Sequence, residues 1–340
     1  MMQERYSRQI LFPSIGEVGQ QTLREKHVLI IGVGALGTQS AEILTRAGIG
    51  TLTIVDRDYI EWSNLQRQYL FTEKDAEQRL PKAIAAKRFL NKVNSDVTID
   101  ARVMDVTPIE MDKLSEDVDL ILDATDNFDI RMMINDMSQK KKIPWIYGSC
   151  VGSYGISYTV LPGETPCLNC LLGMVPVGSE TCDTAGIIQP AATQVVIHQT
   201  TEALKLLVGA ADDVRKKLVS FDLWKNEFVQ MDIHALKKDD CPSCGEKPTY
   251  PYLTYDEQMK VAVLCGRESV QIRPPNMQQR NLRTVAKSLQ KVGGKIEMNE
   301  FLLSFTHEEG RMVLFRDGRA LIHGTNDSNY AKSLYHRYFS

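Results

Sequence analysis

Residues 28–44 read VLIIGVGALGTQSAEIL, an apolar run followed by Gly32, Gly34 and Gly37 in G-x-G-x-x-G order. Between a strand and a helix, the first glycine of this order permits a tight turn. The second lets a phosphate approach the backbone, and the third lets the helix pack closely on the strand. The N-terminus of the helix then offers free N–H groups to an anion. Asp56 ends the next predicted strand, where an acidic residue commonly binds ribose hydroxyls. The stretch therefore predicts a nucleotide-binding α/β domain, whichever nucleotide it holds.

The rest of the N-terminal half continues to alternate strands with helices. We predict strands at 51–56, 97–103, 118–126 and 143–149, and helices at 36–46, 81–94 and 128–141. Such alternation implies a parallel sheet with helices on both faces. Beyond Gly148 the pattern changes, because 153–163 and 218–233 read as antiparallel strands on either side of a helix at 189–209. The expected fold class is α/β, with a Rossmann-like mixed sheet that is parallel in its N-terminal half and antiparallel afterwards.

A chain of 340 residues has room for about two domains. Residues 241–252, CPSCGEKPTYPY, are rich in proline, glycine and cysteine and have the composition of a linker. We therefore expect a nucleotide-binding domain at 1–250, and a small C-terminal α+β domain of unknown role at 251–340. In the second domain, Glu-Gly and Asp-Gly pairs within 307–324 indicate hairpin turns.

Composition excludes several classes of protein. A hydrophobic fraction of 43% with 24% charged residues is ordinary for a globular chain. The net charge of −3 gives no reason to expect nucleic acid or an anionic membrane as a partner. No secretory signal and no membrane-spanning run is present in the sequence, so we expect a cytoplasmic protein. In that reducing setting the seven cysteines are expected to be metal ligands or reactive thiols rather than a disulfide framework.

Polar residues gather where the predicted strands end on the ligand-binding edge of the sheet. They are Asn64, Gln66, Arg67, Gln68, Lys82, Asp123 and Asp126. A hydride-transfer site has no need of two cations and a carboxylate around its phosphates. A nucleoside triphosphate needs cations for its charge and a carboxylate oxygen for its metal. The alternatives are that Arg67 and Lys82 are solvated surface charges and that Asp126 caps the helix at 128–141.

Six separate motifs, in order, resemble the ThiF/MoeB/HesA family, bacterial relatives of ubiquitin-activating enzymes. They are RYSRQI (5–10), GVGALG (32–37), IVDRDYIEWSNLQRQ (54–68), PKA (81–83), DATDN (123–127) and TCDTAGII (181–188). The similarity covers roughly residues 4 to 247. It implies that ATP and Mg²⁺ are used to adenylate the C-terminal glycine of a ubiquitin-like sulfur carrier ending in Gly-Gly. The carrier would serve thiamine thiazole or molybdopterin synthesis, and a sulfurtransferase is a candidate sulfur donor.

The resemblance also implies roles for individual residues. Arg8 would reach into the partner subunit's active site, which implies a homodimer. The resemblance implies that Asp56 binds the ribose of ATP and that Asp126 binds magnesium. The residues implied on the phosphate side are Asn64, Arg67 and Lys82. Two other functions compete with this one: an NAD-dependent oxidoreductase that uses the same glycine loop, and a carrier-binding scaffold without catalysis.

The cysteines fall into two groups. Cys167 with Cys170, and Cys241 with Cys244, form two C-x-x-C pairs that can together hold one tetrahedral Zn²⁺. The family resemblance includes such a structural zinc, whereas the alternatives are a redox pair or unligated thiols. Cys182 lies apart, in a polar loop. The resemblance suggests that its thiol meets the activated carrier or takes part in sulfur transfer, against the alternative of a loop cysteine without chemistry. Because Cys182 is present, we favour the thiazole carrier.

Overall fold

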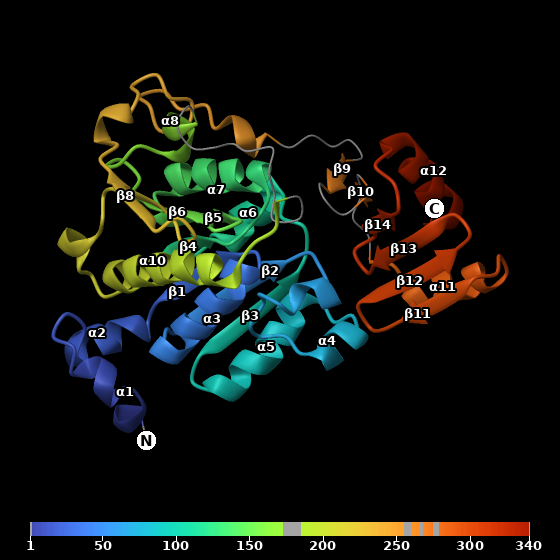
Figure 1. Ribbon diagram of the computed structural model, residues 1–340, viewed down its shortest axis with the longest axis horizontal. Coiled ribbons are helices and arrows are strands. Elements are labelled where there is room, and N and C mark those ends of the chain that lie inside the picture. The colour runs from blue at the N-terminus through green and yellow to red at the C-terminus, as the bar shows by residue number, and fades with distance from the viewer. Residues whose placement is uncertain (1, 173–184, 255–259, 265–267, 275–278, 340) are drawn as a thin grey trace. The chain divides into compact units, whose positions relative to one another are not determined.

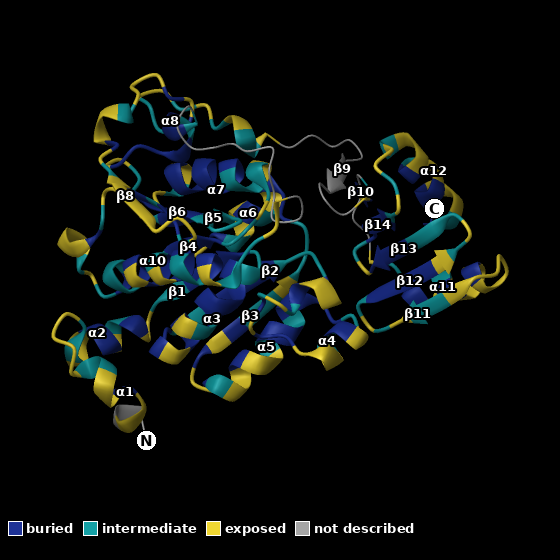
Figure 2. Ribbon diagram, in the orientation of Figure 1, coloured by how far each residue is buried: buried dark blue, intermediate teal, exposed yellow. Residues whose placement is uncertain are grey.

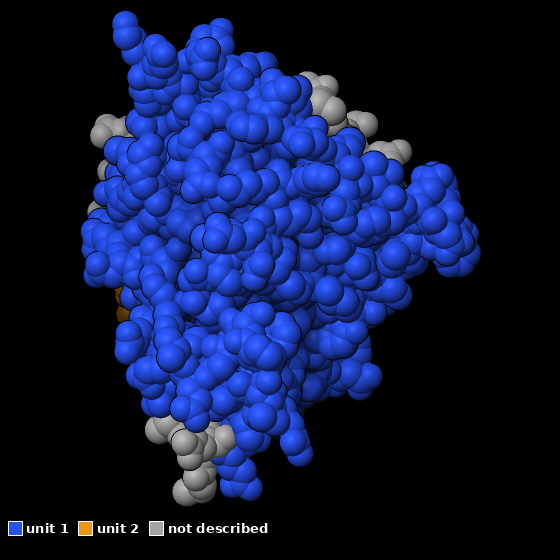
Figure 3. Space-filling model, turned by 90° about the vertical axis from the view of Figure 1, so that its left-hand side faces the viewer, with its two compact units in different colours: residues 1–255 blue, residues 256–340 orange. Residues whose placement is uncertain are grey.

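The computed structural model describes residues 2–172, 185–254, 260–264, 268–274 and 279–339 (Figure 1). The chain divides into two compact units, residues 1–255 and residues 256–340 (Figure 3). Residues 173–184, here called the crossover segment, include Cys182 and lie outside the described residues, as does Cys265. Within the described part of the chain, no helix is both long and apolar enough to cross a membrane.

An eight-stranded sheet forms the centre of the first unit, in the order β3-β2-β1-β4-β5-β6-β7-β8. Its strands are β1 His27–Ile31, β2 Thr51–Asp56, β3 Thr98–Val103, β4 Leu120–Asp123, β5 Trp145–Val151, β6 Tyr154–Val160, β7 Leu218–Asp222 and β8 Glu227–Met231. The strands from β3 to β5 pair in parallel, and those from β5 to β8 pair antiparallel. The predicted mixed α/β sheet is therefore confirmed, including the change of direction near Gly148.

Helices cover both faces of this sheet. The helices α3 Ala35–Ala47, α5 Lys82–Val93 and α10 Gln189–Leu207 share one apolar core with the strands, and α6 Pro108–Leu114 and α7 Phe128–Lys141 share the other. Figure 2 shows the buried residues concentrated in the strands and on the helix faces that turn toward them. Short helices α4 Glu73–Glu77 and α8 Leu168–Leu171 lie in the connections. Pro81 caps α5 instead of occupying its first turn, a shift of one residue from the prediction.

Two regions differ from expectation. The N-terminus forms two helices that the sequence analysis did not predict, α1 Met2–Ile10 and α2 Gly16–Leu23. The stretch at 241–252 is wrongly described as a linker, because much of it is packed. Tyr252 and the neighbouring Leu253 contact the core beneath α7, and the backbone N–H of Tyr252 donates to Asp136 Oδ2 at 2.9 Å. Proline and glycine here shape a folded connection rather than a free one.

The second unit is a six-stranded antiparallel sheet in the order β11-β12-β13-β14-β10-β9. Its strands are β9 Lys260–Leu264, β10 Ser269–Arg273, β11 Lys295–Met298, β12 Leu302–His307, β13 Gly310–Phe315 and β14 Ala320–His323. The helices α11 Leu282–Gln290 and α12 Ser328–Phe339 bury their apolar faces in its core. Hairpins join β12 to β13 and β13 to β14, as the Glu-Gly and Asp-Gly pairs predict.

Candidate nucleotide site and metal centre

The nucleotide loop lies at the point where the order of the sheet reverses. Strand β1 pairs with β2 on one side and with β4 on the other, and Ile31 stands beside both Val55 and Asp123. The connection from β1 runs toward β2, whereas the chain enters β4 from the far edge, after β3. Ligands of open α/β sheets bind outside the carboxyl ends of the strands at such a switch point. The loops that follow β1, β2 and β4 therefore define the candidate site.

The three glycines of the loop answer different demands. Gly32 has φ +97°, and a Cβ there would lie 2.4 Å from the carbonyl oxygen of Ala124. A Cβ on Gly37 would lie 2.0 Å from the carbonyl oxygen of Gly32. Both positions are closed by the fold itself. At Gly34, among the described residues, a Cβ would meet only Gln68 Nε2, at 3.8 Å, so those residues leave the space above Gly34 open. Gly34 is thus the position where a ligand can reach the backbone.

Asp56 and Lys82 come together beside the loop. The carboxylate of Asp56 accepts from the backbone N–H of Val33 at 2.6 Å and from that of Asp58 at 2.7 Å. Lys82 is buried, and its Nζ lies 3.4 Å from Asp58 Oδ2. Burial raises the pKa of Asp56, and the nearby Lys82 ammonium opposes that rise. Because each carboxylate oxygen can accept two hydrogen bonds, Asp56 keeps acceptor capacity for a hydroxyl.

The loop after β2 holds Asn64 and Arg67 in local contacts. Asn64 is buried, and its Oδ1 accepts from the backbone N–H of Glu61 at 3.0 Å, closing a capping box on the short helix Trp62–Asn64. Arg67 Nη1 donates to the carbonyl oxygen of Ser63 at 2.9 Å. The described contacts therefore give Asn64 a role in shaping this loop. Among the described residues, most donors of the Arg67 guanidinium have no hydrogen-bond acceptor.

Asp126 is exposed on the loop after β4. The proposed alternative for it, a cap for α7, is wrong, because Asn127 occupies that position and its Oδ1 accepts from the backbone N–H of Ile130 at 3.0 Å. Arg57 lies close enough to Asp126 for their charges to interact. Burial acts to lower the pKa of Arg57, but the carboxylates of Asp58, Asp105 and Asp126 outweigh it and hold that pKa above its usual value.

Asp123, which the sequence places on the ligand edge with Asp126, is instead buried in an ion pair that the sequence did not predict. Asp123 is fully buried, and its Oδ2 lies 3.0 Å from Arg131 Nε. Burial raises the pKa of Asp123 to about 6, against the opposing effect of Arg131. Burial would lower the pKa of Arg131, but the Asp123 carboxylate outweighs it and holds that pKa above its usual value. The only sequence pattern that could have suggested the pair is an arginine one turn into the helix that follows DATDN.

Arg8 lies far from the glycine loop of its own chain. Its neighbour Gln9 donates from Nε2 to the carbonyl oxygen of Ala47, at the C-terminal end of α3. Gly34 caps the opposite end of that 13-residue helix. At a rise of 1.5 Å per residue, the two ends are about 20 Å apart, which is beyond the reach of an arginine side chain. Arg8 itself is exposed.

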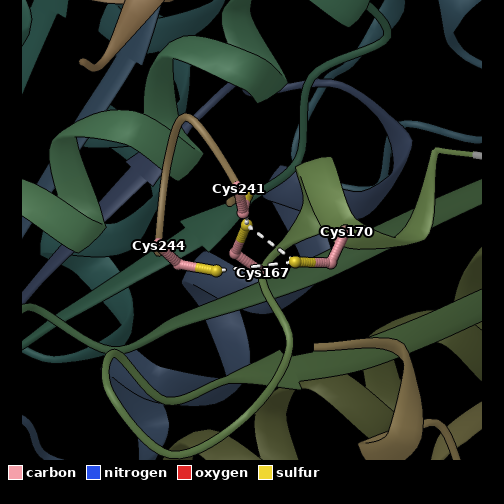
Figure 4. A group of neighbouring side chains, drawn as sticks. All are labelled: Cys167, Cys170, Cys241 and Cys244. Carbon is pink, nitrogen blue, oxygen red and sulfur yellow. Dashed lines mark hydrogen bonds between the residues drawn. The ribbon is translucent and has the colours of Figure 1, made fainter. Parts of the chain in front are cut away.

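The four predicted metal-ligating cysteines converge on one point (Figure 4). All four Sγ atoms of Cys167, Cys170, Cys241 and Cys244 lie within 4.8 Å of one another. Separations of 3.9, 3.6 and 3.5 Å are found for the 167–170, 167–241 and 170–244 pairs. A tetrahedron of sulfurs about 2.3 Å from Zn²⁺ has edges of about 3.8 Å. The cluster therefore has the size of a four-thiolate metal site.

A shell of hydrogen bonds holds the cysteine cluster against α7. Asn135 Oδ1 accepts from the backbone N–H of Leu168 at 2.8 Å, inside the first C-x-x-C pair. Asn169 Nδ2 donates to Ser243 Oγ at 3.0 Å, which links the first pair directly to the second. Such outer contacts fix the orientation of metal ligands. The cluster thus joins segments from distant parts of the chain to one helix.

Comparison with known proteins adds relatives over most or all of the chain. A model for the ThiF family matches residues 6–243. A sulfur carrier protein ThiS adenylyltransferase of Bacillus subtilis is 53% identical over 337 residues, 99% of each chain. An Escherichia coli protein of the same description is 37% identical, covering 71% of this chain and 94% of its own. A molybdopterin-synthase adenylyltransferase of Escherichia coli is 32% identical, with 71% and 96% covered.

The solved structures add a likeness of fold. A crystal structure of Escherichia coli MccB with MccA-N7isoASN superposes with a TM-score of 0.63 at 23% identity. The match covers 71% of this chain and 75% of that one.

Proposed function

This chain belongs to the ThiF family, and from that premise we propose that it adenylates the C-terminal glycine of a ThiS-type sulfur carrier. It is an adenylyltransferase that acts on ubiquitin-like sulfur carriers, as its relatives along most or all of the chain are. Neither the oxidoreductase nor the inactive scaffold has support among these relatives. The observation that supports nucleotide chemistry best is the open backbone at Gly34, beside the Asp56–Lys82 cluster.

The nucleotide is ATP in this proposal. Its phosphates lie over Gly34 and the N-terminus of α3, where free N–H groups and the helix dipole favour an anion. Asp56 accepts the ribose hydroxyls. Lys82 and Arg67 face the phosphates, since both carry positive charge on the ligand edge of the sheet. Asn64 shapes the loop that carries Arg67.

The chemical step is the attack of one anion on another. The terminal carboxylate of the carrier attacks the α-phosphorus, an acyl-phosphate bond forms, and the bond to pyrophosphate breaks. The carboxylate is already ionised near pH 7, so no general base is required. Arg67 and Lys82 lower the repulsion and stabilise the charge that develops on the phosphate oxygens. Most of the rate enhancement then comes from positioning and electrostatics.

Magnesium is the implied cofactor, and Asp126 is the residue proposed to hold it. When bound, Mg²⁺ neutralises phosphate charge and orients the leaving pyrophosphate. The donor set fits a hard cation, since Asp126 offers exposed carboxylate oxygens at the edge of the site.

We propose that the active unit is a homodimer in which Arg8 completes the partner subunit's site. Arg8 cannot reach its own loop, so a role in the reaction requires a second copy. Leu11, Phe12 and Val18, which follow Arg8 closely in sequence, expose 68%, 56% and 81% of their surface. Exposed apolar side chains of this size are typical of an interface.

The metal of the cysteine cluster is proposed to be structural zinc. All four tetrahedral positions would be occupied by protein thiolates, so no position is left open for a substrate. Cys167 and Cys170 precede the crossover segment and Cys241 and Cys244 follow α10. Zinc would therefore fix both ends of the part of the chain that carries Cys182.

The choice of carrier follows from the extent of similarity. The Bacillus relative, whose description names ThiS, matches over both units, whereas the molybdopterin relative matches 71% of this chain. A thiol at Cys182 available for sulfur transfer is part of the same proposal, as is a sulfurtransferase as donor. A MoaD-type carrier for molybdopterin synthesis is the alternative substrate.

Carrier-dependent exchange between ATP and pyrophosphate tests the function. The purified protein is assayed with Mg²⁺ and with a ThiS-type carrier, a MoaD-type carrier, or a carrier lacking its final Gly-Gly. Exchange with the ThiS-type carrier alone supports the proposal. Exchange with the MoaD-type carrier alone would show that the MoaD-type carrier is the substrate instead. Carrier binding without exchange indicates a scaffold, and NADH binding without exchange indicates an oxidoreductase.

A further inference from the structure

We propose that Arg131 is a positioning residue for adenylation: it fixes the loop 123–127 in the form that presents Asp126 to the metal. Arg131 lies on α7 and is not needed to contact the nucleotide. The inference rests on the proposed function, because it concerns Asp126, the residue proposed to bind magnesium.

The hydrogen bonds of Arg131 hold the loop 123–127 in place. Its Nε donates to Asp123 Oδ2 at 3.0 Å, and its Nη2 donates to the carbonyl oxygens of Thr125 at 2.7 Å and Gly148 at 3.2 Å. The guanidinium also stands over the ring of Tyr147, 5.2 Å from its centroid. One planar group therefore ties the start and the middle of the loop after β4 to the neighbouring strand β5. A lysine could not make these contacts together, since its ammonium is a single point.

The loop 123–127 makes further hydrogen bonds on each side of Asp126. The backbone N–H of Thr125 donates to Asp123 Oδ1 at 3.0 Å, and that of Asn127 donates to Thr125 Oγ1 at 3.1 Å. Gln199 Nε2 holds the carbonyl oxygen of Asp123 at 2.7 Å from the α10 side. Asp126 itself is the exposed member of a loop whose other residues are tied down. The contacts of Asp123 and Arg131 thus hold the backbone on which Asp126 stands, while the Asp126 side chain itself is exposed.

The same loop touches the glycine turn. The N–H of Ala124 donates to the carbonyl oxygen of Ile31 at 2.9 Å, and the carbonyl of Ala124 leaves no room for a Cβ on Gly32. A displaced loop would therefore disturb the relation between the metal carboxylate and the phosphates. The cost of losing Arg131 should appear as a weaker response to Mg²⁺, more than as a loss of nucleotide contacts.

The test compares Arg131→Lys with Arg319→Lys as a matched control. Arg319 is also a buried arginine paired with an aspartate, Asp317, at 2.6 Å, but it belongs to the second unit. Binding of a non-hydrolysable ATP analogue is measured by calorimetry with Mg²⁺ and with EDTA, and the Mg²⁺ concentration for half-maximal exchange is determined. For Arg131→Lys we expect that concentration to rise about tenfold or more, with affinity in EDTA unchanged. For Arg319→Lys both quantities should match the wild type.

The outcomes separate the inference from the function on which it rests. A folded Arg131→Lys protein with the wild-type Mg²⁺ requirement overturns the inference. So does an equal loss of affinity with Mg²⁺ and with EDTA. If Arg131→Lys does not fold, the double variant Asp123→Asn, Arg131→Gln removes both charges together and should show the same raised requirement. Absence of exchange in the wild-type protein contradicts the proposed function instead.

Discussion

Cys167 Sγ lies 3.6 Å from Cys241 Sγ, although 74 residues separate them in the chain. Four thiolates this close would repel one another, and a cation between the sulfurs would remove that repulsion, so we expect metal binding to stabilise the cluster. We expect the purified protein to hold one zinc per chain. Cys241→Ser should lower the metal content and destabilise the first unit by more than about 2 kcal/mol.

Elemental analysis and thermal unfolding measure these two effects. Cys150→Ser is the matched control, because Cys150 lies on β5, outside the cluster, and its replacement should leave the zinc content unchanged. A Cys241→Ser protein with full zinc content would remove this residue from the ligand set.

The features that the sequence predicts correctly are those that depend on residues close together in the chain. The glycine spacing, the alternation of strands and helices and the two C-x-x-C pairs each occupy short stretches, so they can be read without knowing what lies opposite. The contacts of Arg131 could not be predicted this way, because one of its acceptors, the carbonyl oxygen of Gly148, lies on β5, which is distant in the sequence. The docking of α1 has the same character, since Tyr6 accepts a hydrogen bond from Asn94 Nδ2 at 2.8 Å across 88 residues.

The glycine loop offers a test that separates folding from binding. At Gly34 an added methyl group meets only Gln68 Nε2 at 3.8 Å, whereas at Gly37 it meets the carbonyl oxygen of Gly32 at 2.0 Å. Gly37→Ala should therefore cost about 3 kcal/mol or more of stability through overpacking. Gly34→Ala should fold like the wild type, because no backbone atom of the described residues lies within 4 Å of the added methyl group.

The same Gly34→Ala variant should bind ATP at least about tenfold more weakly, because its methyl group occupies space given to phosphate. Thermal unfolding and calorimetric titration with ATP provide the two measurements. ATP affinity equal to that of the wild type would mean that the phosphates do not lie over Gly34.

Acid stability depends on a histidine outside the site. His198 on α10 is partly buried, with its Nδ1 3.2 Å from Arg215 Nη1 and its ring near that of Phe228. Burial and the Arg215 charge lower the pKa of His198, and the Glu202 carboxylate opposes them more weakly. The folded protein thus binds this proton less readily than the unfolded chain, whose histidines have pKa values of about 6.5.

The titration of His198 should therefore lower stability as the pH drops below about 6.5, because its proton binds preferentially to the unfolded state. His198→Gln removes the titrating group, and its melting temperature should fall less steeply than that of the wild type between about pH 6.5 and 5. His234→Gln is the control, since His234 lies on a short 3₁₀-helix of the same unit. If the melting temperatures of His198→Gln and the wild type fall equally with pH, His198 does not cause the loss of stability at acid pH.

Subunit mixing tests whether Arg8 acts across a dimer. Arg8→Ala and Arg67→Ala should each lose carrier-dependent exchange by about 100-fold or more, because each removes a cation from the phosphates. In a mixed dimer, the Arg67→Ala subunit supplies an intact Arg8 to the partner site, which keeps its own Arg67. One site of that dimer is then complete, and the other lacks both arginines.

With equal amounts and free exchange of subunits, half of the dimers are mixed, so about a quarter of all sites should regain activity. Size-exclusion chromatography with light scattering checks that both variants remain dimers. Mixing Arg8→Ala with itself provides the baseline. No recovery in a sample proven to contain mixed dimers would place Arg8 outside the partner's site. The 20 Å length of α3 would then exclude it from its own site as well, leaving Arg8 without a part in the reaction.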